Sequence, residues 1–72
     1  MGRVSEFEAV LRGQIAHAER GLEQAQRAGL DHEAHLHGAR LLDLLDRATG
    51  HGVDAPAWVR PEVLAAAREN HA

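Results

Sequence analysis

Apolar residues recur every three or four positions along most of this chain, and this spacing limits its fold more than any other feature. Steps of three and four match the helical repeat of 3.6 residues, so the apolar side chains of the first segment share one face of a helix over residues 5–28. Ser5 is placed to cap this helix, and Glu6 and Glu8 carry negative charge in its first turn. The apolar positions are Val4, Phe7, Leu11, Ile15, Ala18, Leu22 and Ala25.

Glycine and proline divide the remainder of the chain. Gly29 suits the left-handed position after the first helix, and Asp31 is placed to cap a second helix over residues 32–49. Because this connection is short, the second helix must fold back against the first. A short turn over 55–59 follows, and Pro61 is suited to open a last helix over residues 61–70. We therefore predict an all-α fold, an antiparallel helical hairpin plus a short C-terminal helix, in one domain over residues 1–72.

The size of the chain predicts that the protomer associates with a second copy. A chain of 72 residues without cysteine has one small core and no disulfide to reinforce it. Alanine accounts for 14 of its residues, which further reduces the apolar area that the core buries. We therefore expect a homodimer in which two hairpins form a four-helix bundle. The alternative to a second copy as the partner is a different protein.

The second helix has the widest apolar face. Leu42 and Leu44 widen the stripe formed by Ala34, Leu41, Leu45 and Ala48, so that this helix is able to touch two neighbours. Leu36 lies on the opposite side, either as a tolerated exposed leucine or as a contact beyond the hairpin. We predict a protein interface formed by Leu36, Leu41, Leu42, Leu44, Leu45, Trp58 and Val59.

Two glycines inside the first helix predict close contacts on two of its sides. A glycine in a helix interior costs roughly 1 kcal/mol relative to alanine. Gly21 lies beside the main apolar stripe, where it would let another helix approach closely. Gly13 groups with Ala9 and Ala16 on the far side, which predicts a contact there with the last helix or with a partner chain. Neutral drift in a chain rich in alanine and glycine explains these glycines equally well.

Six histidines are present, and three of them are clustered at His32, His35 and His37. His32 and His35 share a helical side and, with Asp31 as a third donor, form a candidate metal site. The alternative is a set of surface pairs between Asp31 and His35 and between Glu33 and His37. His37 lies at the edge of the apolar face and His17 at the flank of the first helix, so both are also candidate interface histidines.

Charge is distributed unevenly. Residues 31–54 carry the whole net charge of −3 and four of the six histidines, whereas the segments before and after them are balanced. Protonating all six histidines would change the net charge to +3, and histidine titrates near physiological pH. A second hypothesis is therefore that the cluster of His32, His35 and His37 makes the chain a metal- or pH-responsive sensor, with association or stability changing between about pH 7 and 5.5.

Other classes of function fit the sequence poorly. The arginines alternate with glutamates instead of forming a basic patch, so a DNA-associated regulator ranks third and nucleic acid is not an expected partner. Ser5 and Thr49 are the only hydroxyl side chains, and we expect neither an enzyme nor a cofactor. No apolar run is long enough for a membrane span, and the start at Met1 lacks a signal peptide, so we expect a cytoplasmic protein.

Taken together, these observations predict a small, non-catalytic protein–protein interaction or regulatory adaptor module, with the interface described above as its functional surface.

Overall fold

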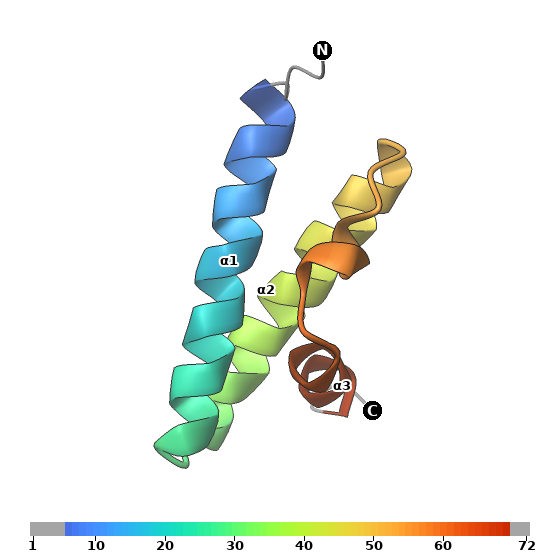
Figure 1. Ribbon diagram of the computed structural model, residues 1–72. Helices are drawn as coiled ribbons and strands as arrows, with labels where there is room; N and C mark the ends of the chain where they lie inside the picture. Colours follow the sequence, from blue (N-terminus) through green and yellow to red (C-terminus); the bar gives the residue numbers. More distant parts are fainter. Residues whose placement is uncertain (1–5, 70–72) are drawn as a thin grey trace.

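The computed structural model describes residues 6–69 and confirms the predicted all-α fold. Helices α1 (Glu6–Arg27) and α2 (Asp31–Gly50) form an antiparallel hairpin, and a short 3-10 helix, η1 (Ala55–Trp58), leads into the C-terminal helix α3 (Pro61–Glu69) (Figure 1). The two long helices diverge from their connecting turn, and η1 and α3 lie against the same side of the hairpin. Val4, Ser5 and the last residue of the predicted third helix lie outside the described residues.

Gly29 closes α1 in the way that the sequence predicts. Its φ of 71° is in the left-handed region, and the Leu30 N–H donates to the carbonyl oxygen of Ala25 at 2.9 Å. This bond across five residues is typical of a Schellman motif, which satisfies carbonyl groups that a helix end would otherwise leave without partners. The turn is therefore short, and it holds the hairpin closed at this end.

The start of α2 differs from the prediction. Asp31 is the first residue of the helix and does not cap it; Leu30 occupies the cap position and has no side-chain cap hydrogen bond. The backbone carbonyl of Leu30 instead accepts from the Ala34 N–H at 2.9 Å. The Schellman turn uses Leu30 to end α1, so the chain enters α2 one residue earlier than the capping pattern implied. Asp31 remains in the first turn, where a carboxylate interacts favourably with the helix dipole and so stabilises the helix.

The core lies between the two long helices and α3. Ile15, Leu22 and Leu41 are its largest fully buried side chains, and every residue of the predicted stripe from Leu11 to Ala25 is buried. Six of the fourteen buried apolar residues in the described part of the chain are alanine, so the core is small. These alanines are Ala18, Ala25, Ala34, Ala48, Ala55 and Ala67.

Helix α3 is held in place by a small-residue contact and by one arginine. A Cβ placed on Gly38 in α2 would lie 3.5 Å from the Cα of Ala67, so the two helices are in close contact there. Arg60, just before α3, pairs with Glu19 and Glu23 of α1, and its backbone N–H donates to Glu19 Oε2 at 3.3 Å. The connection between η1 and α3 is therefore tied to α1.

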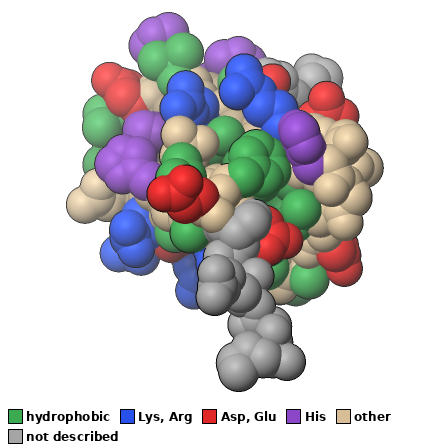
Figure 2. Space-filling model, turned by 90° about the horizontal axis from the view of Figure 1, so that it is seen from above, with side chains coloured by type: hydrophobic (Ala, Val, Ile, Leu, Met, Phe, Trp, Pro, Cys, Tyr) green, Lys and Arg blue, Asp and Glu red, His purple; other side chains and the backbone are tan. Residues whose placement is uncertain are grey.

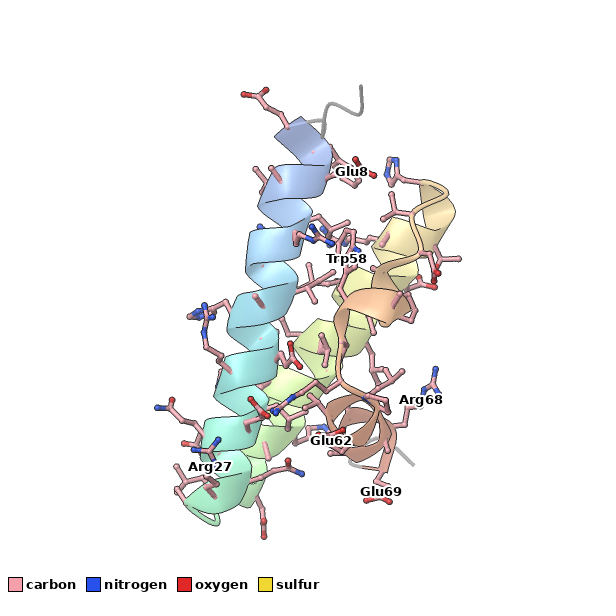
Figure 3. The ribbon with its side chains drawn as sticks, viewed as in Figure 1. Glu8, Arg27, Trp58, Glu62, Arg68 and Glu69 are labelled. Carbon is pink, nitrogen blue, oxygen red and sulfur yellow. The ribbon has the colours of Figure 1, made fainter. Side chains whose placement is uncertain are left out.

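Trp58 of η1 lies further along the hairpin, where α1 and α2 have begun to separate (Figure 3). Its ring is partly buried, and the guanidinium carbon of Arg12 in α1 lies 4.5 Å from the ring centroid. A cation at this distance interacts favourably with an aromatic face. The η1–α3 segment therefore contacts α1 at two places and covers one side of the hairpin.

Candidate interaction surface

Most of the predicted interface belongs to the core of the protomer. Leu41, Leu44, Leu45 and Val59 are all buried within one chain. A partner could reach them only by displacing α1 or α3, because these helices already cover them. The wide apolar face of α2 does touch two neighbours, as the sequence predicted, but both neighbours come from the same chain. Leu42 and Trp58 are partly buried against the core, and Leu36 alone of the seven is exposed, at 53%.

The two sides of the hairpin differ in what covers them. On α1, Glu19 and Glu23 flank the buried stripe on one side and face Arg60. At 100° per residue, Gln14, His17 and Gly21 flank it on the opposite side. The η1–α3 segment therefore covers the side of Glu19 and Glu23 and leaves the other side of the hairpin exposed.

An open groove of about 570 Å³ runs between α1 and α2 on this exposed side. We call it the hairpin groove. It combines small, apolar and polar side chains from both helices, and Arg40 is the one residue with a fixed charge among the described residues that line it. The lining residues are Val10, Gly13, Gln14, His17, Ala18, Leu36, His37 and Arg40.

Apolar side chains from both helices are exposed in the hairpin groove. Val10 on α1 is 59% exposed and Leu36 on α2 is 53% exposed. Between them, Gly13 has no neighbour within 4 Å of a Cβ built on it, so α3 does not make the contact that the sequence offered for this glycine. A contact between the Gly13 side of α1 and a partner chain stays a prediction, and neutral drift explains an unobstructed Gly13 equally well.

His37 and His17 lie where the sequence placed its candidate interface histidines. The ring of His37 packs directly over Gly21, and a Cβ on this glycine would lie 2.5 Å from His37 Nδ1. Gly21 therefore lets α2 approach α1 closely, as predicted, with a histidine ring filling the space. His17 and His37 both line the hairpin groove and also the adjoining hollow beside Arg20 and Arg27.

The candidate metal ligands are not assembled into a site. Asp31, His32 and His35 are exposed at the start of α2. Within residues 6–69, the structure has no group of three or more His, Asp or Glu side chains placed to hold a metal ion.

At the open end of the hairpin, two aromatic rings are in contact. Phe7 at the start of α1 is partly exposed and meets the ring of His51, which follows α2, at a centroid distance of 4.5 Å. Viewed from this end, hydrophobic side chains are exposed among charged side chains and histidines (Figure 2). This contact bridges the ends of the two long helices.

The sequence contains a weak signal for the hairpin groove. Val10, Gln14, His17 and Gly21 follow one another at steps of four, three and four residues, which is a helical stripe beside the main apolar one. Its mixed composition makes the stripe hard to recognise, because only one of the four residues is a large apolar residue.

None of the helices within residues 6–69 has the length and apolar character needed to cross a membrane.

Comparison with known proteins finds no family model, curated protein or solved structure that matches this chain.

Proposed function

We propose that this chain is a non-catalytic interaction module that forms a homodimer, with the hairpin groove of one copy packed against the hairpin groove of the other. The observation that carries the proposal is the exposure of Val10 and Leu36 in one groove between two helices. Contact between two such faces would remove both side chains from water. Burying a large aliphatic side chain contributes ~1.5–3 kcal/mol, so a dimer with two copies of each gains substantially.

The small core supports a second copy as the occupant. Domains of this size seldom gain more than ~3–5 kcal/mol from their own core, and here alanine makes up much of that core. Association is a common way for such chains to gain further stability, since a partner that binds only the folded state stabilises it.

The dimensions of the protomer also support a dimer. The molecule measures 43 × 20 × 17 Å, and the hairpin groove lies along one of its long sides. A side of this size is comparable with the ~800 Å² that each partner buries in a stable interface of standard size. Two hairpins packed on this side would form a four-helix arrangement with one α3 helix on each outer face.

Charge does not oppose this arrangement near neutral pH. Arg40 is the one fixed charge among the described residues of the hairpin groove. A two-fold interface brings identical surfaces together, so a groove with several charges of one sign would repel its copy. A nearly neutral groove avoids this repulsion.

The test is a charge introduced at Leu36. We expect Leu36→Lys to abolish the dimer, because it removes the apolar contact and adds a second positive charge beside Arg40 on each face. Sedimentation equilibrium at pH 7.5 measures the mass. Ala65→Lys is the matched control, because Ala65 is an exposed helical residue of α3, away from the hairpin groove, and receives the same side chain.

The expected result is a dimeric mass for the unmodified chain and for Ala65→Lys, and a monomeric mass for Leu36→Lys with unchanged helical circular dichroism. A monomeric mass for the unmodified chain at about 1 mM, the weak end of specific association, would overturn the proposal. A dimer that Ala65→Lys breaks and Leu36→Lys leaves intact would place the interface on the side of α3 instead.

A further inference from the structure

We propose that acid separates the two copies through His17 and His37, so that the homodimer is a pH-sensitive one. This inference rests on the proposed dimer and adds its regulation. Of the predicted cluster at His32, His35 and His37 it keeps only His37, and it assigns the pH response to His17 and His37, two histidines on different helices that line the same groove.

The two histidines are placed where a partner would cover them. His17 comes from α1 and His37 from α2, and both line the hairpin groove beside Arg40. His37 is partly buried, and its ring fills the space over Gly21. An imidazolium at this position could not remain fully hydrated once a second copy covered the groove, and burying an unpaired charge is costly.

The surroundings of the two histidines hold more positive than negative charge. On α1, Arg20, Arg27 and Glu23 line the adjoining hollow, and Glu23 is already paired with Arg60. On α2, Arg40 lines the hairpin groove. Glu33, one turn before His37, lines a further hollow together with His37, and among the described residues that line these hollows it is the one carboxylate that does not pair with an arginine.

The single negative charge of Glu33 cannot compensate for the two positive charges of protonated His17 and His37. With both histidines neutral, the residues of the hairpin groove carry the single charge of Arg40, whereas with both histidines protonated they carry three positive charges. In a two-fold dimer each face meets its own copy, so six positive charges would lie along one interface. Like charges placed against one another across an interface oppose association, and salt weakens this repulsion.

The test measures the dissociation constant of the dimer at pH 7.5 and pH 5.5 by sedimentation equilibrium. We expect the dissociation constant of the unmodified chain to increase about tenfold or more at pH 5.5, which corresponds to a change of at least ~1.4 kcal/mol. The His17→Gln, His37→Gln double variant should lose most of this change, because glutamine keeps a polar side chain that does not titrate. His32→Gln is the control, since His32 is exposed outside the hairpin groove.

Each outcome separates this inference from the proposed dimer. A dimer of equal affinity at both pH values would overturn the pH response and leave the proposed function standing, whereas no dimer at pH 7.5 would overturn both. A pH response that persists in the double variant and disappears in His32→Gln would assign it to the cluster at the start of α2. Circular dichroism at pH 5.5 completes the test, because loss of helix there would attribute dissociation to unfolding and contradict the inference.

Discussion

At the scale of single residues, the glycines of α1 show how one residue type serves different purposes in one helix. Gly21 lies under the ring of His37, where any side chain would collide with that ring. Gly13, two turns earlier, faces open space. The sequence does not distinguish Gly13 from Gly21, because a glycine shows that a side chain is absent but does not indicate which residue packs against it. Only the packing of α2 distinguishes the two positions.

This difference predicts opposite responses to alanine. Gly13→Ala should raise the free energy of unfolding by roughly 0.5–1 kcal/mol, because alanine has the higher helix propensity and nothing obstructs it. Gly21→Ala should not raise the free energy of unfolding, because the His37 ring must move away from Gly21 and the contact between the two helices is weakened. Urea unfolding at a concentration where the chain is monomeric measures both values. Equal stabilisation by the two variants would show that His37 moves aside without cost.

At the scale of helices and turns, the sequence was most informative about where each helix begins and ends. Gly29 and Pro61 act locally, through a left-handed φ and through a missing N–H, so their effects could be predicted without knowledge of the fold. The observed bounds of all three α-helices lie within one residue of the predicted ones over the described residues. Asp31 was misassigned because the Schellman turn before it uses Leu30 in the position of the cap.

What covers each helix could not be predicted in the same way. Periodicity shows that Leu41, Leu44 and Leu45 are on an apolar face, but it does not distinguish a neighbour in the same chain from a second copy. The pairing of Arg60 with Glu19 joins residues 41 positions apart, and no local pattern indicates it. The predicted interface therefore consists largely of residues that α1 and α3 bury. Which side of the hairpin stays exposed depends on where α3 packs, and no local pattern in the sequence indicates this.

The pairing of Arg60 predicts a measurable contribution to the docking of α3. Arg60→Ala should lower the free energy of unfolding by about 1 kcal/mol, the upper range for partly exposed ion pairs, because Glu19 and Glu23 both lose their cation. Arg47→Ala is the matched comparison, since its pair with Asp43 at 3.3 Å is highly exposed and should contribute less than ~0.5 kcal/mol. Thermal unfolding at low and at high salt measures the difference, which added salt should reduce. Equal losses in the two variants would show that Arg60 does not hold α3.

At the scale of the whole molecule, the covered and exposed sides of the hairpin form the central contrast. The η1–α3 segment protects one side of a small, alanine-rich core, and the other side presents Val10 and Leu36 to solvent. A chain built in this way has stability still to gain from association. The proposed interaction surface is the side that the last helix of the chain leaves exposed.

This arrangement predicts that thermal stability depends on protein concentration. The melting temperature should rise by several degrees as the concentration is raised about a hundredfold, because mass action adds ~2.7 kcal/mol when the ligand, here the second copy, reaches about a hundred times its dissociation constant. Circular dichroism melts over this range provide the measurement. Leu36→Lys should melt at one temperature throughout, and a constant melting temperature for the unmodified chain would contradict a dimer of functional affinity.

The short turn at Gly29 also has a consequence for how quickly the chain folds. Because α1 and α2 are joined by so few residues, their first contacts close a very small loop, and small loops form on a timescale of about 10–100 ns. Helical proteins with such local contacts fold in microseconds to milliseconds. The hairpin can therefore form before α3 docks on it, so that newly made chains would spend little time with their leucines exposed to other unfolded chains.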